Sequence, residues 1–309
     1  MKEGRLKYFI AAFTAVIMWG FFSIPLRMLR DYNSDQILYY RIFTSLILTW
    51  LYILLFRKKQ IKLDMKFFRQ EDKLSRRKII WLSLLAGFLI TGNWFTFIYA
   101  INNVSLKSAA FAYMVCPLIT AMGGFLILKE KLTNMKLIAL GLASISIVIL
   151  AQGSLMDVFW SILIAALYSF YLIIQRAMVG IDKFNMLGLH LLIATFLMLP
   201  FFISEFQSFP SDLSFWLTIV VISIFFTIIP LFLSLYALIG MPSSTLGIII
   251  YINPIVAFAV AFFYFHEGIS LLQLYSYSLL LVAVIVFNWA IIKDILFKSP
   301  AIDGQVTSP

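Results

Sequence analysis

Two ionisable side chains, Arg41 and His190, lie within long apolar stretches of the 309-residue sequence. An ionisable group inside a membrane span costs free energy, so it is a functional candidate by default. The guanidinium of Arg41 suits a fork-like contact with a carboxylate or phosphate, which predicts either an anionic substrate or a gate partner. Both residues lie near one end of their stretch, so snorkelling toward the headgroups is the alternative for each.

Carboxylates are missing from the middle of every apolar stretch. A proton relay through Asp or Glu therefore has no evident position in the sequence. Proton coupling would have to use His190 or the acids at helix ends.

Two prolines, Pro117 and Pro254, interrupt similar apolar runs. A proline inside a helix lacks an N–H and frees the carbonyl four residues earlier, here those of Tyr113 and Ile250, and it kinks the helix. A free carbonyl in lipid is costly, so we expect both kinks to face protein or a wet cavity. The alternative is that prolines are simply commoner in membrane helices than in soluble ones.

A glutamate follows each proline at the same distance of 13 residues, as Glu130 and Glu267. Each ends its apolar run, so we interpret both as hinges or caps that lie near the N-terminus of the following helix, where the helix dipole favours a negative charge. Direct contact with a substrate is the alternative.

The composition places the chain in lipid. Hydrophobic residues make up 62% of it and charged residues 12%, with a mean hydropathy of +0.99. The single cysteine excludes an internal disulfide framework. The first apolar stretch is longer than the roughly 7–15 residues of a signal-peptide core, so we interpret it as a retained span.

A bilayer core of about 30 Å needs about 20 apolar helical residues, and this criterion predicts ten spans. They are 8–27, 37–56, 79–101, 106–128, 134–151, 156–175, 185–204, 214–238, 243–265 and 270–292. The basic segment 57–78 is predicted as a solvated cytoplasmic loop that orients the chain, or alternatively as an amphipathic strip on the inner leaflet.

Basic residues predict the orientation. With cytoplasmic termini, all but four of the 24 Lys and Arg residues fall on the cytoplasmic side. This asymmetry accounts for the net charge of +10 without a nucleic-acid partner. We therefore expect a multi-pass protein of the plasma membrane with both termini in the cytoplasm.

An internal repeat relates the two halves. An offset of 137 residues matches Pro117 with Pro254, and an offset of 149 matches Trp19 with Tyr168 and Arg41 with His190. Five spans per unit is an odd number, so the second unit enters the membrane from the opposite side, as in secondary transporters. The predicted units are residues 8–151 and 156–292, followed by a cytoplasmic tail, 293–309.

Several motifs resemble the drug/metabolite transporter superfamily, with its paired EamA-type repeats, and within it the RarD family. They are MWGFFSIPL at 18–26, DQILYYRI at 35–42, GNWFTFIYAINN at 92–103, YMVCPLI at 113–119 and STLGIIIYINP at 244–254. The resemblance implies an all-α, ten-helix secondary transporter of small organic metabolites or drugs. It also implies a central cavity lined by helices 1, 3, 4, 6, 8 and 9, with the others packed outside.

The residue types at those positions supply aromatic faces and neutral hydrogen-bonding groups for an amphipathic or aromatic solute. The candidates are Trp19, Asn93, Trp94, Tyr99, Asn102, Asn103, Tyr113, Tyr168, Tyr236, Tyr251 and Asn253, together with Arg41 and His190. As partners we expect the lipid bilayer and a small-molecule substrate.

Enzymes and primary pumps are disfavoured. The sequence holds no His-Glu-x-x-His zinc pair and no phosphate-binding G-x-x-x-x-G-K-[ST] loop. It also has no nucleophile with a base at a credible spacing, and we expect neither a metal nor a cofactor. A channel-like facilitator or a non-transporting membrane scaffold stays open as the alternative to a transporter.

Overall fold

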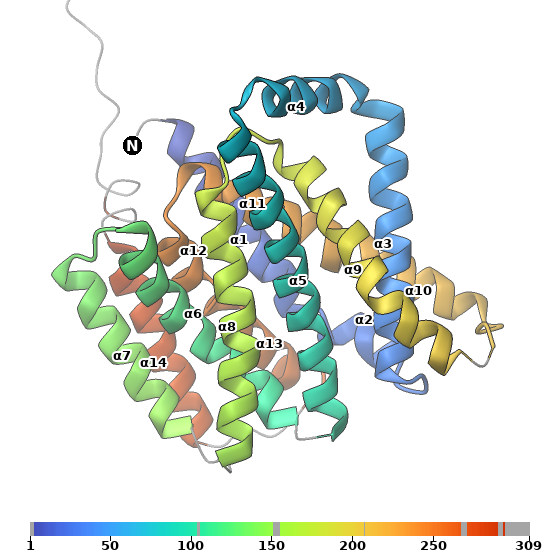
Figure 1. Ribbon diagram of the computed structural model, residues 1–309. Coiled ribbons are helices and arrows are strands. Elements are labelled where there is room, and N and C mark those ends of the chain that lie inside the picture. The colour runs from blue at the N-terminus through green and yellow to red at the C-terminus, as the bar shows by residue number, and fades with distance from the viewer. Residues whose placement is uncertain are drawn as a thin grey trace, which may run out of the picture.

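The computed structural model describes residues 3–103, 106–150, 155–206, 208–266, 271–289 and 293. Every regular element in these ranges is a helix (Figure 1). This outcome follows from the apolar solvent, because a lipid-exposed helix satisfies its backbone hydrogen bonds internally.

The predicted ten spans correspond to seven helices in the described residues that are long and apolar enough to cross a membrane, together with three shorter apolar ones. The first five are α1 with α2 (Glu3–Gly20, Ser23–Met28), α3 (Ser34–Phe56), α5 (Lys73–Asn103), α6 (Leu106–Leu128) and α7 (Asn134–Leu150). The second five are α8 (Leu155–Ala177), α9 (Lys183–Glu205), α10 with η1 and α11 (Leu213–Ser223, Ile224–Ile228, Ile229–Gly240), α12 with α13 (Ser243–Ile249, Ile252–Phe263), and α14 (Leu271–Phe287).

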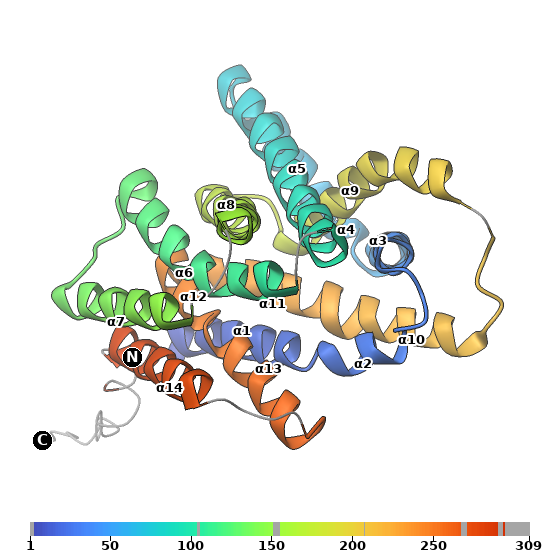
Figure 2. The same ribbon diagram turned by 90° about the horizontal axis from the view of Figure 1, so that it is seen from below.

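The two five-span units interlock. Helix α1 of the first unit packs against α11 and α13 of the second, and its counterpart α8 packs against α5 and α6 of the first. Equivalent helices also meet, namely α3 with α9, α6 with α12 and α7 with α14 (Figure 2). Two further contacts are reciprocal, because α5 packs on α9 and α10 packs on α3. This reciprocal pattern is that of an inverted repeat.

Backbone geometry repeats as well. Lys129 and His266 both have φ = 54°, in the left-handed region that non-glycine residues rarely adopt. Each follows the end of the fourth helix of its unit, and 137 residues separate them. The N–H of Glu130 donates to the carbonyl of Gly124 at 3.1 Å, so a carbonyl in the last turns of α6 receives a donor from beyond the helix.

The segment 57–78 differs from the preferred prediction of a solvated loop. Its residues Lys58–Gln70 form a helix, α4, and the rest leads into α5 at Lys73. Helix α4 runs across one end of the bundle between α3 and α5 (Figure 1). Its apolar and charged residues separate onto different faces, which agrees with the alternative of an amphipathic strip.

Three spans are irregular, and the sequence predicted a kink in the ninth of them, at Pro254, but none in the other two. The first breaks at Phe21 and Phe22, between α1 and α2. The eighth contains the π-helical turn η1, and the ninth breaks at Ile250 and Tyr251, just before Pro254. By contrast, α6 is continuous through Pro117. The matched prolines therefore do not have matched effects on the helix.

Candidate functional site

A central cavity of about 320 Å³ lies between the two units. Its lining comes from α1, the α1–α2 junction, α2, α3, α5, α6, α8, the η1–α11 segment and α13. Seven of the candidate residues line it: Trp19, Arg41, Asn93, Trp94, Tyr113, Tyr168 and Asn253. The six expected spans all contribute. The second span, expected to pack outside, also contributes through Arg41.

Trp19 joins α1 to the irregular eighth span. Its indole N–H donates to the carbonyl of Phe226 in η1 at 3.0 Å. Pro230 lies four residues after Phe226 and has no N–H to offer that carbonyl, so an indole from another helix supplies a donor. The ring of Trp19 also meets Tyr168 edge-on, with centroids 6.2 Å apart.

Asn93 makes the corresponding connection in the other unit. Its side-chain amide donates to the carbonyl of Ile164 in α8 at 2.9 Å, and the residue is 2% exposed. Asn93 matches Pro230 at the offset of 137. The first helix of each unit is thus held to the third helix of the other by one hydrogen bond beside the cavity.

Arg41 supplies the only Lys, Arg, Asp or Glu side chain among the described residues that line the cavity. Its guanidinium lies 5.3 Å from the ring centroid of Trp94 and 5.9 Å from that of Phe22. Such cation–π contacts compensate part of the cost of holding a cation away from water. The buried Nε of Arg41 has no hydrogen-bond partner in the described structure, and neither has the buried Oγ of Ser23, which also lines the cavity.

His190 does not line the cavity. It is 1% exposed, with Nδ1 at 3.3 Å from the hydroxyl of Tyr171 and Nε2 at 3.3 Å from the amide of Gln175. Its ring packs edge-on against Tyr171. The structure therefore places His190 in polar contacts between α8 and α9, outside the lining of the central cavity.

Other candidates also lie outside the cavity. Tyr251 is fully buried, and Tyr236 packs its ring against Tyr8 at 5.0 Å. Tyr99 is 40% exposed and stacks on Trp160 near the end of α5. Asn103 is exposed and donates to the carbonyl of Tyr99, while the side chain of Asn102 lies outside the described residues.

Glu130 caps a helix, but not the one expected. Its carboxylate accepts the backbone N–H groups of Ser243 and Ser244 at 2.7 and 3.0 Å, and also the Ser243 hydroxyl. These donors belong to the first turn of α12 in the second unit, whereas the predicted partner was the helix that follows in sequence, α7. The favourable charge at a helix N-terminus is as expected. Glu267 lies outside the described residues.

Gly124 makes this cap possible. A Cβ at that position would lie 2.7 Å from Oε2 of Glu130 and 2.9 Å from the Ser243 hydroxyl. Only glycine leaves room there for the carboxylate and the start of α12 together.

Several lining residues, including Phe22, Ser23 and Phe226, were not predicted from the sequence. Phe22 and Ser23 lie in the quoted MWGFFSIPL motif, so the motif carried the signal. Phe226 reaches the cavity through the π-helical turn, and Pro230 is the one mark of that turn in the sequence. No group of three or more His, Cys, Asp or Glu side chains able to hold a metal was found in the described residues.

Comparison with known proteins agrees with this architecture. The EamA-like transporter family model matches the chain twice, over residues 6–152 and 155–289. The chain is 28% identical over 295 residues to the uncharacterized transporter YojE of Bacillus subtilis, covering 91% of this chain and 94% of YojE. It is 27% identical over 286 residues to Protein RarD of Streptomyces exfoliatus, covering 90% of this chain and 86% of that protein.

A solved crystal structure of another protein has the same fold. The two chains superpose with a TM-score of 0.75 at 15% identity, over 93% of this chain and 98% of the other. At this identity the similarity concerns the fold alone. Because the family model matches both halves, the chain belongs to the EamA-like transporter family, as a RarD-like member of the drug/metabolite transporter superfamily.

Proposed function

We propose that this protein is a secondary transporter that moves small organic solutes across the plasma membrane by alternating access. The observation that carries the proposal is the central cavity between two interlocked inverted units. In such an architecture the two units exchange inward-open and outward-open arrangements around a central site.

The lining favours a solute with an apolar or aromatic body and one anionic group. Aromatic rings of Trp19, Trp94 and Tyr113 provide the apolar surface. Arg41 provides a guanidinium whose Nε has no protein partner in the described residues, and an anionic group would supply one. Asn253 adds a neutral polar group to the lining. The orientation with cytoplasmic termini belongs to this proposal.

The test begins with growth of a deletion strain on a panel of drugs and metabolites, to choose a solute. Flux of that solute is then measured in liposomes with purified protein. A carrier shows saturation and counterflow, because each solute must occupy the site before it crosses. A channel-like facilitator shows flux without counterflow, and a scaffold shows no flux.

Two tryptophans provide a matched pair of variants for the same assay. Trp94→Ala removes a ring that lines the cavity and lies beside Arg41. Trp81→Ala removes a ring that is 61% exposed on α5. We expect the half-saturation concentration to rise about fivefold or more for Trp94→Ala, as expected for the loss of about 1 kcal/mol of aromatic contact. Equal effects of the two variants would contradict the central site.

A further inference from the structure

A second pocket, of about 520 Å³, lies beneath α4 at one end of the bundle. Its walls come from α3, α4, α5, α9 and the link between α8 and α9, and it shares no lining residue with the central cavity. The volume falls in the range of roughly 300–1,000 Å³ that is usual for small-molecule sites.

The pocket is apolar and open at its side. Ile53 and Met186 form part of its buried wall, at 1% and 2% exposure. Met65, Ile80 and Leu84 form part of its rim, and they are 47%, 48% and 46% exposed. The rim residues on α5 continue into the exposed apolar surface of a membrane-spanning helix. The pocket therefore opens toward lipid.

The charges of the flanking segments place the pocket at the edge of the hydrocarbon core. Helix α3 is apolar up to Phe56 and is followed at once by Arg57. Helix α5 begins with a basic segment, residues 73–78, before the apolar run from Ile79 onward. The lining residues of both helices lie within the first turns below these charged borders, at the depth where an acyl chain begins.

A basic stripe on α4 lies beside the pocket. It consists of Lys58, Lys62, Lys66 and Arg69, spaced three or four residues apart along one face. Arg69 itself lines the pocket, next to the apolar stripe of Ile61, Met65 and Phe68. An exposed cluster of Lys and Arg next to a membrane span attracts anionic lipid headgroups.

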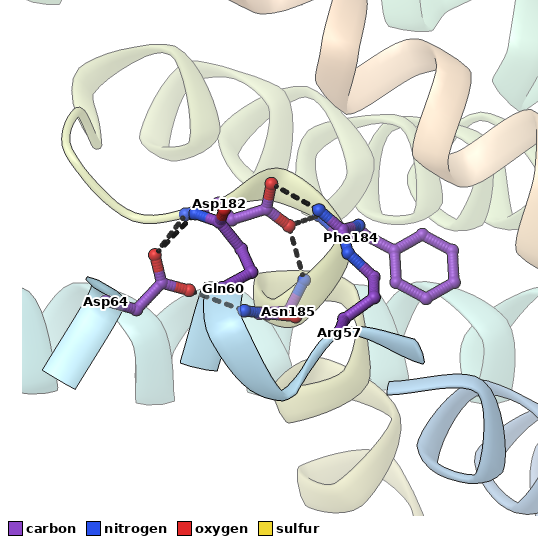
Figure 3. Close-up of polar contacts among 6 residues, drawn as sticks. All are labelled: Arg57, Gln60, Asp64, Asp182, Phe184 and Asn185. Atoms are coloured by element: carbon purple, nitrogen blue, oxygen red, sulfur yellow. Dashed lines mark hydrogen bonds and ion pairs between the residues drawn. The ribbon is translucent and has the colours of Figure 1, made fainter. Parts of the chain in front are cut away.

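Polar contacts fix α4 over the pocket (Figure 3). The carboxylate of Asp64 accepts the backbone N–H of Asp182 at 3.2 Å and the amide of Asn185 at 2.6 Å. Arg57 donates to the carboxylate of Asp182 at 2.9 Å. Asp64 also lines the pocket, but its oxygens are engaged by neutral donors of the α8–α9 link and α9. The roof of the pocket is thus attached to the second unit.

We infer that this pocket holds an acyl chain of an anionic phospholipid, whose phosphate lies against Arg69 and the basic stripe of α4. The lateral opening, the depth and the charge all favour this occupant over a transported solute or a protein segment. The proposal concerns a site separate from the central cavity and does not depend on the transport activity.

The experiment uses the full chain, purified in detergent and depleted of lipid. Binding of phosphatidylglycerol and phosphatidylcholine is titrated by native mass spectrometry. Met65→Trp fills the pocket from its roof, and Leu84→Trp fills it from α5, in case the first variant does not fold. Arg69→Gln removes the charge at the rim. Lys131→Gln removes an exposed charge from the α6–α7 link and is the control.

The proposal predicts a distinct result for each variant. The wild-type protein should bind phosphatidylglycerol more tightly than phosphatidylcholine. The Met65→Trp and Leu84→Trp variants should bind neither lipid at this site. Arg69→Gln should weaken phosphatidylglycerol binding about fivefold, the contribution of one basic residue near an anionic surface. It should weaken phosphatidylcholine binding less, because the choline cation offsets the charge of the phosphate. The control should match the wild type. Unchanged lipid binding in folded Met65→Trp and Leu84→Trp proteins would overturn the proposal, and so would equal binding of the two lipids by the wild type.

Discussion

Arg41 combines two features that rarely occur together, a permanent charge inside a span and an Nε without a partner in the described residues. A lysine can supply the charge but cannot reproduce the planar fork or lie flat against aromatic rings. Arg41 is adjacent to Trp94 and Phe22 and lines the cavity, which argues against snorkelling as its whole role.

We predict that Arg41→Lys weakens transport of an anionic substrate by about 1–3 kcal/mol, the range for hydrogen bonds to charged groups. The change should appear as a higher half-saturation concentration in liposome flux, normalised to folded protein. A neutral solute of similar shape should be affected less. If the half-saturation concentration and the maximal rate are both unchanged, Arg41 does not contact the substrate.

Glu130 connects the fourth helix of one unit to the ninth span in the other. Glu130→Gln keeps one carbonyl acceptor but loses the charge that the first turn of α12 favours. We predict a loss of about 1–2 kcal/mol in stability, measured as a lower Tm in detergent. Asp31→Asn is the control, because the Asp31 side chain is 85% exposed. Equal Tm values for both variants would show that the cap contributes little.

At the residue scale, the types of side chain that line the cavity could be predicted from the sequence. The face that each helix turns toward the cavity was harder to predict. Arg41 and His190 occupy matched positions, yet only Arg41 lines the cavity. Membrane helices are apolar on both their lipid-facing and protein-facing sides, so the sequence does not distinguish a cavity-facing position from a buried one. The contact of His190 with Tyr171 depends on where the tertiary fold brings side chains of α8 and α9 together, which no local pattern encodes.

At the element scale, the interruptions of the helices are concentrated in the lining of the central cavity. The α1–α2 junction, the π-helical turn and α13, just after the break in the ninth span, all contribute lining residues. Irregular backbone at membrane depth is tolerated where it is buried in protein or faces a cavity, and π-helical turns often occur at functional sites. The sequence predicted one of these interruptions through Pro254. It did not predict the turn before Pro230, because a single extra residue per turn leaves almost no local pattern.

Pro254 and Pro117 offer a comparison between a broken span and a continuous one. Pro254→Ala restores an N–H that can bond the carbonyl of Ile250 and join α12 to α13, which moves the cavity residues Asn253 and Ala257. We predict a several-fold lower maximal rate of transport with normal insertion into the membrane. Pro117→Ala should have a smaller effect, because α6 is already a continuous helix.

The amount of folded protein in detergent is the control for both proline variants. An equal loss of folded protein would favour a packing role for the two prolines. Equal and full transport by both variants would exclude a role of the break in the transport cycle.

At the scale of the whole molecule, the pairing of helices follows from the repeat that the sequence contains. An inverted unit places equivalent helices together, and the pairs α3 with α9, α6 with α12 and α7 with α14 fit that rule. The exchange of first helices between the units is not encoded in any local pattern. It arises because α1 and α8 each find their buried surface in the opposite unit, where Trp19 and Asn93 provide the connecting hydrogen bonds.

Contacts between links that lie far apart in the sequence agree with a chain that crosses the membrane at every span. At one end of the bundle, Arg57 pairs with Asp182 and Glu130 caps α12. At the other end, the hydroxyl of Tyr32 donates to the carboxylate of Asp212. This bond raises the pKa of Tyr32. A chain that crosses the membrane ten times places its successive links on alternate sides. This accounts for the first set of links meeting at one end of the bundle and the second set at the other.

An even number of crossings would place both termini on one side, and the positive-inside rule predicts that this side is the cytoplasm. We predict that green fluorescent protein fused to either terminus becomes fluorescent, because it folds in the cytoplasm. Alkaline phosphatase fused to either terminus should stay inactive, because it needs the extracytoplasmic side. Alkaline phosphatase inserted after Arg30, between α2 and α3, is the control and should be active. Alkaline phosphatase activity at one terminus alone would contradict the count of ten crossings. Activity at both termini, with an inactive control, would keep the count and reverse the orientation, because the basic end of the bundle would then face outward.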